Sequence, residues 1–244
     1  MIEIKLSKNY NLKGYTLIEG FPGAGLVGPM AASYIVEKLS MEYIGDISSD
    51  SFPPIAAIHN GIPMYTARLY MDEKRKLLVM LAEFTIPTNV VYALGMEIIS
   101  FIRKYGIKNV ISIGGLPMQQ PGNNAYIISS DEDFGKQAKK QGIKNIQEGV
   151  IAGVSAILLV NAVHYNIPVA DILVEVNPAI LNPKYAEIAI MTLDKLIGIE
   201  IDLRELEKES KVVEAKVKDM LGKAKETHDR YSKSAEPAGP PTYA

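Results

Sequence analysis

Short β-like runs alternate with longer segments of helical periodicity along most of the chain, and this alternation limits the possible folds more than any other feature. The β-like runs occupy residues 15–19, 43–47, 55–59, 64–71, 77–84, 109–113, 126–129 and 169–176. The segments of helical spacing occupy residues 24–39, 90–105, 131–141, 150–163 and 184–197. Strands that alternate with helices predict an α/β sandwich. The consecutive β-like runs between residues 43 and 84 predict a mixed sheet, with a hairpin at Asn60-Gly61.

Charge and cysteine content narrow the class of partner. The 244 residues include 26 basic and 28 acidic side chains, a net charge of −2, so no global field favours nucleic acid or an anionic membrane. Nucleic acid and membrane are therefore not expected as partners. The chain contains no cysteine, which excludes a disulfide framework, thiolate metal sites and thiol catalysis. Because such a composition suits a reducing compartment, we expect a cytoplasmic protein.

No segment of the sequence predicts a membrane span or a secretory signal. The most apolar window, residues 150–163, is shorter than the roughly 20 residues needed to cross a bilayer. Its small residues Gly153 and Ala156 predict close packing, so we expect a buried helix. The first residues include an acid at Glu3 and lack the uninterrupted apolar run of a secretory signal.

The composition changes after Asp202, where charges of both signs alternate. In this segment one set of residues recurs at alternating intervals of three and four, the spacing of a heptad seam. Its members are Leu203, Leu206, Ser210, Val213, Val217, Met220, Ala224 and Thr227. The pattern predicts a helix over residues 203–233, which either packs on its own domain or projects and self-associates as a short coiled coil. We expect three parts: an α/β domain over residues 1–202, this amphipathic helix, and a tail over residues 234–244, whose three prolines and glycine predict a mobile chain.

One glycine-rich turn fits the fingerprint of a dinucleotide-binding loop. It reads Gly23-Ala24-Gly25-Leu26-Val27-Gly28 and lies between a predicted strand and a predicted helix. However, Phe21-Pro22 separates the strand from the first glycine, and β hairpins follow Asp46 where a nucleotide-binding half would need a further helix and strand. We therefore expect no cofactor, and we interpret the segment as a tight turn with close helix–strand packing.

No other motif assembles a catalytic or metal site. His59, His164 and His228 are far apart in the sequence, and none has a second ligand at metal-binding spacing. Ser155 follows Gly153 as in a nucleophile elbow, but no glycine stands at position 157 and the segment is predicted to be mid-helical. We expect no catalytic, cofactor-binding or metal-binding residues.

Four motifs follow one another between residues 20 and 202. They are Gly20-Phe21-Pro22-Gly23-Ala24-Gly25-Leu26-Val27-Gly28, Gly114-Gly115-Leu116-Pro117, Gly149-Val150-Ile151-Ala152-Gly153 and the stretch from Asn182-Pro183 to Asp202. Together they resemble archaeal members of the proteasome-assembly-chaperone family. The resemblance implies a three-layer α/β/α fold similar to nucleoside phosphorylases and related hydrolases, without their active site. It also implies a role in assembling the proteasome core by holding its α subunits, and a homo-oligomer of four or five subunits.

The resemblance further implies a docking function for the C-terminus. A tail of this kind consists of a hydrophobic residue, a tyrosine and a final residue whose free carboxylate pairs with a lysine between α subunits. Here Tyr243 is penultimate and Ala244 supplies the carboxylate, while Thr242 stands where a hydrophobic residue is expected. We predict that these three residues bind the partner. A mobile tail that follows a helix also acts as a tethered ligand, whatever its motif. Several such tails on one oligomer would bind with avidity.

Two other functions remain open from the residues alone. The alternative class is an enzyme of phosphorylase, hydrolase or ligase type, with residues 20–28 and 114–117 lining its cleft. A scaffold for some other complex would differ only in its partner. Saturable stabilisation by a small ligand would favour the enzyme, and co-purification with α subunits would favour the chaperone.

Overall fold

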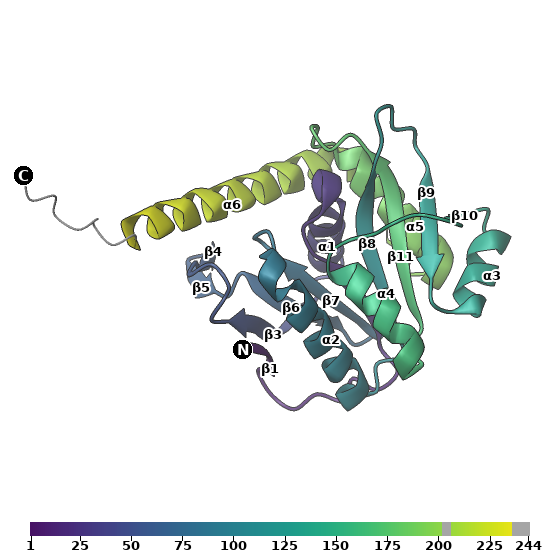
Figure 1. The fold of residues 1–244 in the computed structure, drawn as a ribbon, viewed down its shortest axis with the longest axis horizontal. Helices are drawn as coiled ribbons and strands as arrows, with labels where there is room; N and C mark the ends of the chain where they lie inside the picture. Colours follow the sequence, from purple (N-terminus) through teal and green to yellow (C-terminus); the bar gives the residue numbers. More distant parts are fainter. Residues whose placement is uncertain (202–205, 236–244) are drawn as a thin grey trace, which may run out of the picture.

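The chain folds around a nine-stranded mixed sheet that carries helices on both faces (Figure 1). This computed structural model describes residues 1–201 and 206–235, and within the last helix it describes the side chains of residues 215 and 217–230. The strand order is β1-β3-β6-β7-β2-β8-β11-β9-β10. The strands are β1 (Ile2–Leu6), β2 (Thr16–Gly20), β3 (Glu42–Ser49), β6 (Ala67–Asp72), β7 (Leu77–Ala82), β8 (Asn109–Pro117), β9 (Ala125–Ser129), β10 (Lys144–Asn145) and β11 (Val169–Val176).

The four central strands β7, β2, β8 and β11 are parallel, while β1, β3 and β6 run antiparallel to their neighbours. All eight residues of β11 are buried, as expected for a strand covered on both faces. This mixed α/β sheet confirms the fold class predicted from the alternation of β-like and helical segments. The predicted likeness to nucleoside phosphorylases stays a prediction.

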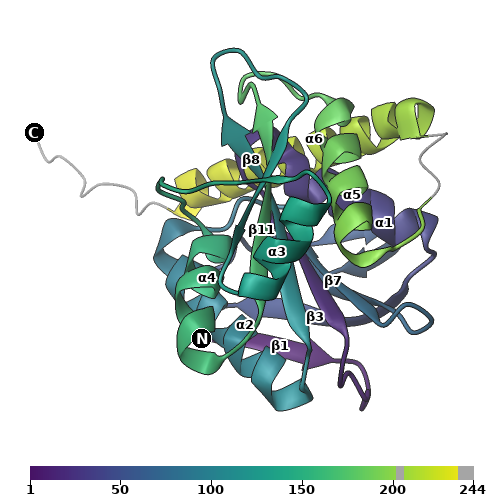
Figure 2. The same ribbon diagram turned by 90° about the vertical axis from the view of Figure 1, so that its right-hand side faces the viewer.

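Helices cover the sheet in two layers (Figures 1 and 2). Helices α1 and α5 pack together on one face, and helices α2 and α4 pack together on the other. In the described residues the α-helices are α1 (Val27–Lys38), α2 (Val91–Tyr105), α3 (Glu132–Lys140), α4 (Val154–Tyr165), α5 (Pro183–Ile197) and α6 (Leu206–Ala235). Two hydrophobic clusters form the core, one between the sheet and each helical layer. Alternate residues of each central strand supply them: Ile18 belongs to the α1/α5 side and Leu17 to the α2/α4 side.

Local chemistry explains where the elements begin and turn. The predicted hairpin at Asn60-Gly61 is confirmed between β4 (Ala57–His59) and β5 (Ile62–Met64), and both residues have positive φ angles, 52° and 79°. The helix predicted over residues 150–163 begins only at Val154. Gly153 has a φ of 97°, which a helix does not accommodate, so the preceding motif is non-helical.

The C-terminal helix packs on its own domain through its middle. Val217 is buried in the cluster beneath α1 and α5, and Leu221 packs against the same cluster. Residues 225–230 are exposed, and Figure 1 shows the helix running outward past the sheet. The middle of α6 therefore packs on the domain while its later residues are exposed, and self-association as a coiled coil stays a prediction. The division into a domain, a helix and a tail stays a prediction, and Leu203 and the tail lie outside the described residues.

Within the described residues, no helix combines the length and the apolarity required to cross a membrane.

Candidate functional site

Three of the glycine motifs meet at one cavity of about 170 Å³. Gly23 and Ala24 come from the first motif, Gly114 and Gly115 from the second, and Gly153 from the third. The cavity lies at the carboxyl end of β2 and beside the middle of β8 and β11, next to the start of α4. Ligands of open α/β sheets bind at this kind of position, where connections leave the sheet in opposite directions. The fold thus joins motifs that are far apart in the sequence.

The first glycine motif makes a tight turn that brings α1 against the sheet. Gly25 and Leu26 have φ angles of 65° and 52°, so α1 begins only at Val27. A Cβ on Gly28 would lie 2.7 Å from the backbone oxygens of Ile113 and Phe21. The interpretation as a tight turn with close helix–strand packing is confirmed, because glycine is required there for space.

A row of three polar side chains crosses the parallel strands beneath α4. Glu19 of β2 is the register partner of Ser112 of β8, and Ser112 is the register partner of Asp171 of β11. Adjacent strands lie about 4.8 Å apart, so the two acidic residues are separated by roughly 10 Å between their Cα atoms. All three are buried on the face that carries α2 and α4, and both carboxyls line the cavity.

Burial weakens the acidity of both carboxyl groups. Loss of solvent raises the pKa of Glu19 to about 7, although the backbone N–H of Phe21, which donates a hydrogen bond at 2.8 Å, and the Ser112 hydroxyl oppose the rise. Loss of solvent, and then the charge of Glu19, raise the pKa of Asp171 to about 7, while Ser155 opposes that rise. Both carboxyl groups therefore change protonation state near neutral pH.

Two atoms of this row lack hydrogen-bond partners. Asp171 Oδ1 and Ser112 Oγ are buried, and neither has a partner in hydrogen-bonding geometry, although Ser112 lies close enough to Glu19 to influence its pKa. An unpartnered buried polar atom costs about 1–3 kcal/mol. The fold retains this cost, and of the two residues Asp171 lines the cavity.

Another carboxyl of the same strand shows the opposite arrangement. Glu175 of β11 accepts hydrogen bonds from Gly122 N at 2.7 Å, Tyr126 Oη at 2.8 Å and Asn124 Nδ2 at 3.1 Å. Desolvation alone would raise the pKa of Glu175, but these donors lower it below its usual value. Glu175 is thus a satisfied structural carboxylate that holds the β8–β9 loop, whereas Asp171 is not satisfied.

Ser155 does not lie where the sequence predicted. It was expected in the middle of a helix, but α4 begins at Val154, so Ser155 stands in the first turn and lines the cavity beside Asp171. The lining residues include two carboxyls and this hydroxyl, but no basic side chain and no histidine. The arrangement can hold protons and accept hydrogen bonds from a ligand. It lacks the imidazole or amine that usually activates a serine.

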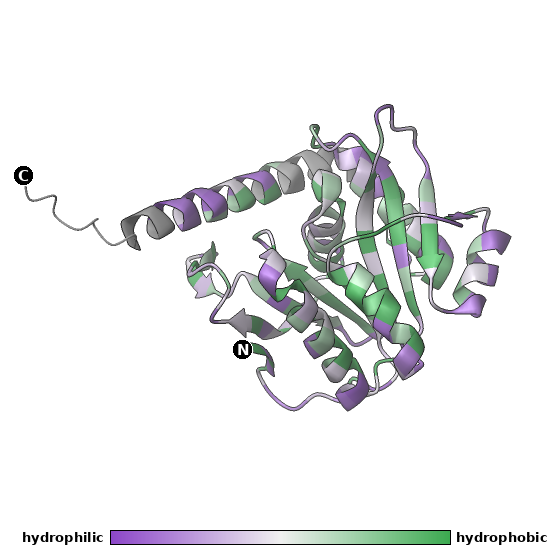
Figure 3. Cartoon of the chain, viewed as in Figure 1, coloured by the Kyte–Doolittle hydropathy of each residue, from purple (hydrophilic) through white to green (hydrophobic). Residues whose placement is uncertain are grey.

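The outer face of the α2/α4 layer carries exposed apolar side chains. Val160 and Val163 of α4 are 67% and 64% exposed, and Tyr92 of α2 is 63% exposed. Figure 3 shows α4 coloured as hydrophobic along most of its length. A helix that is apolar on all sides is usually covered, so this face has the composition of an interface.

A groove of about 690 Å³ separates α6 from the β4–β5 hairpin. Met220, Ala224 and Thr227, three members of the predicted seam, line it. Glu83 and His59 also line the groove; Glu83 lies 3.1 Å from His59 Nε2 and pairs with the buried Arg68. The seam therefore faces this groove instead of lying wholly against the domain.

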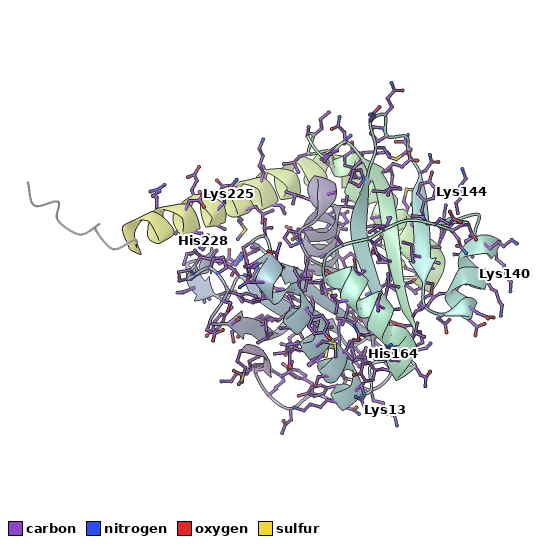
Figure 4. The ribbon with its side chains drawn as sticks, in the orientation of Figure 1. Lys13, Lys140, Lys144, His164, Lys225 and His228 are labelled. Atoms are coloured by element: carbon purple, nitrogen blue, oxygen red, sulfur yellow. The ribbon has the colours of Figure 1, made fainter. Side chains whose placement is uncertain are left out.

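The residues predicted to bind the partner, Thr242, Tyr243 and Ala244, lie outside the described residues, so their role stays a prediction. Among the described side chains, no group of three or more histidines and acids could hold a metal ion. His164 lies on α4 and His228 on α6, in separate parts of the molecule (Figure 4). The polar row was missed by the sequence interpretation. Its signal was the placement of acids inside otherwise apolar strands.

Comparison with known proteins identifies relatives of the entire fold. The chain is similar to Pyrococcus furiosus PbaA, an archaeal homolog of proteasome-assembly chaperone, with 25% identity and a TM-score of 0.81 over 95% of this chain and 99% of PbaA. It resembles P. furiosus PbaB, an archaeal proteasome activator, in fold, with 20% identity and a TM-score of 0.74 over 89% of this chain and 98% of PbaB. An uncharacterized protein of Methanocaldococcus jannaschii is 26% identical over 238 residues, which cover 95% of this chain and 90% of the relative.

The family model of the PAC2 family matches residues 17–221. This range contains all four motifs on which the resemblance was based, and the resemblance is confirmed. The chain belongs to the PAC2 family.

Proposed function

We propose that this protein is a proteasome-assembly chaperone that binds the α subunits of the proteasome core. The observation that carries the proposal is the likeness to PbaA, with a TM-score of 0.81 over 95% of this chain and 99% of that one. The two proteins share the complete fold, not one motif. The proposed activity is binding, because a chaperone of this kind acts by holding its clients.

The exposed apolar face supports self-association as part of this function. Val160, Val163 and Tyr92 lie on two helices that pack side by side, and no described element covers them. Buried apolar area is the main source of free energy in such contacts. We propose that copies of the chain associate through this face into the predicted homo-oligomer of four or five subunits.

We propose that the tail contributes part of the binding to the α subunits. A short peptide buries little area and loses entropy when it becomes ordered, so its binding energy must be concentrated in few groups. Tyr243 is the large side chain of residues 242–244, and Ala244 carries the carboxylate. Several tails on one oligomer would act together, since each bound tail raises the effective concentration of the next.

Surface plasmon resonance on immobilised proteasome core tests this proposal with the full-length protein. Tyr243→Ala is expected to weaken binding by about 2 kcal/mol per tail, typical of a buried aromatic anchor. Thr242→Leu is expected to strengthen it by about 1 kcal/mol, because it restores apolar contact. One residue added after Ala244 should weaken binding by displacing the carboxylate. Tyr231→Ala is the matched control, since it removes the same side chain outside the tail.

The outcomes separate the parts of the proposal. If removal of residues 242–244 leaves the affinity unchanged, the tail has no role and any binding rests on the α/β domain. If the wild-type chain neither binds the proteasome core nor co-purifies with isolated α subunits, the chaperone function itself is refuted.

The cavity does not favour the alternative of a phosphorylase. Such an enzyme must hold phosphate, and the residues that line the cavity include Glu19 and Asp171 but no basic side chain. Two buried carboxyls would repel an anion. We therefore do not propose a phosphorylase function.

A further inference from the structure

The cavity beneath the three glycine motifs is large enough for a small organic molecule and reaches the surface. Its volume is about 170 Å³, and an apolar cavity of about 150 Å³ in another protein binds benzene. Gly23, Ala152 and Gly153 line it and are exposed, so they form its mouth. Glu19 and Asp171 lie at its floor, where both are buried.

Two carboxyl groups lie at the floor of the cavity, and no lining residue supplies a positive charge. Glu19 and Asp171 are the titratable groups among the lining residues, which come from β2, β8, β11, α4 and the adjoining loops. Above neutral pH both carboxyls tend to ionise, and two buried negative charges without a cation are costly. The site therefore favours a ligand that brings a positive charge.

An unsatisfied acceptor also favours a ligand that donates hydrogen bonds. Asp171 is 1% exposed, its Oδ1 atom has no hydrogen-bond partner, and the residue faces the cavity. Glu175 of the same strand accepts three hydrogen bonds, so the fold can satisfy a carboxylate on this strand when it is structural. At Asp171 the missing donor would come from a ligand.

The walls of the cavity are apolar. Ile86, Val91, Ile113, Ile151 and Leu173 surround the space above the carboxyls. A hydrated metal ion gains nothing from such walls and prefers more oxygen ligands than two carboxyls provide. A hydrocarbon chain that ends in a cation matches both the floor and the walls.

We propose that this cavity binds a small aliphatic amine, with its ammonium group between the Glu19 and Asp171 carboxyls and its hydrocarbon chain against the apolar walls. An ammonium has three donors, so it can bond both carboxylates and the Ser155 hydroxyl. Charge-assisted bonds of about 2.8 Å to each carboxylate span roughly 5.6 Å, a separation that side chains two strands apart can reach. The binding goes beyond the chaperone function and does not depend on it.

The experiment measures thermal unfolding of the full-length chain with n-butylamine as the probe and n-butanol as the uncharged control, at constant ionic strength. At pH 8.0 the amine is protonated, as a lysine side chain is. At ten times its dissociation constant, it should lower the unfolding equilibrium constant about elevenfold, which corresponds to a rise of roughly 3–6 °C in Tm. The same amine should have little effect at pH 5.5, where both carboxyls are protonated.

Two variants locate the site. Asp171→Asn keeps the shape of the side chain but removes its charge, and it should abolish most of the shift. Glu3→Gln removes one negative charge from an exposed position on β1 and should leave the shift intact. If Asp171→Asn fails to fold, the contrast between pH 8.0 and pH 5.5 in the wild type carries the test.

Several outcomes would overturn the proposal. An equal shift with butanol would show an apolar cavity without charge recognition. An equal shift in Asp171→Asn would place the amine elsewhere. Stabilisation by Mg²⁺ or Ca²⁺ without stabilisation by the amine would assign the carboxyls to a metal. No shift with a folded wild type at about 100 mM amine would show that no amine binds with useful affinity. Each of these results is independent of proteasome binding.

Discussion

Replacing Asp171 by asparagine should stabilise the protein increasingly as the pH rises. Burial raises the pKa of this carboxyl from 3.8 to about 7, so the folded state binds a proton that the unfolded state has lost. Stability therefore falls as the pH rises from the unfolded pKa to the folded pKa, and it changes little above. An asparagine side chain does not ionise, so the unfolding free energy of the variant should not decrease with pH for this reason.

The magnitude follows from the two pKa values. At pH 5.0 the wild-type penalty is about 2 kcal/mol, and at pH 8.5 it is about 4 kcal/mol, because each unit between the two pKa values corresponds to about 1.4 kcal/mol. The asparagine amide introduces buried donors that cost about 1–3 kcal/mol, but this cost is the same at both pH values. The difference in unfolding free energy, variant minus wild type, should therefore rise by roughly 2 kcal/mol from pH 5.0 to pH 8.5.

Urea denaturation at both pH values measures this change directly. Glu3→Gln is the control, because it neutralises an exposed acid on β1 and should show no such rise. A constant difference across the two pH values would mean that Asp171 is not destabilised when ionised. A difference that falls with pH would mean that it has a favourable partner, and the reasoning about the unsatisfied row would be refuted.

Three further predictions concern the turn, the helical face and α6. In denaturation experiments, Gly25→Val should lower the unfolding free energy by more than about 2 kcal/mol, because Gly25 has a φ of 65° and a Cβ there would lie 3.0 Å from the Val176 side chain. Gly23→Val is the control, and it should be tolerated because Gly23 has extended backbone and open space around it. Val160→Asp should shift the protein toward monomer in light scattering, and an unchanged mass would exclude this face from self-association. Truncation after Asp202 should leave cooperative unfolding intact. It should lower the unfolding free energy by about 1.5–3 kcal/mol, because it exposes the surface that Val217 covers. Loss of cooperative unfolding would show that α6 belongs to the core.

The sequence was informative where a pattern is local. Residues 169–176 were predicted as a strand and form β11 with those bounds, because a run of buried apolar residues is typical of a central parallel strand. β1 was missed, although its five residues alternate apolar and charged side chains with the period of a strand that has one exposed face. The start of α4 was placed too early, because a helical spacing of apolar residues does not reveal the backbone angle of Gly153.

The polar row could not be found in this way. Glu19, Ser112 and Asp171 belong to three separate segments, and only the register of β2, β8 and β11 brings them together. No spacing rule along one chain encodes a register across parallel strands. A usable signal exists, however: an acid within a strand that is otherwise apolar and buried on both faces must have a partner or a cost.

The two edge strands of the sheet carry features that hinder aggregation through strand pairing. β1 forms one edge, and it directs Glu3 and Lys5 to solvent between half-buried isoleucines; β10 forms the other edge and has only two residues. Charged side chains and very short strands both discourage the addition of a foreign strand. Both edges therefore disfavour open-ended strand pairing between copies, which can continue without limit, whereas a contact between helical faces can close into a finite assembly.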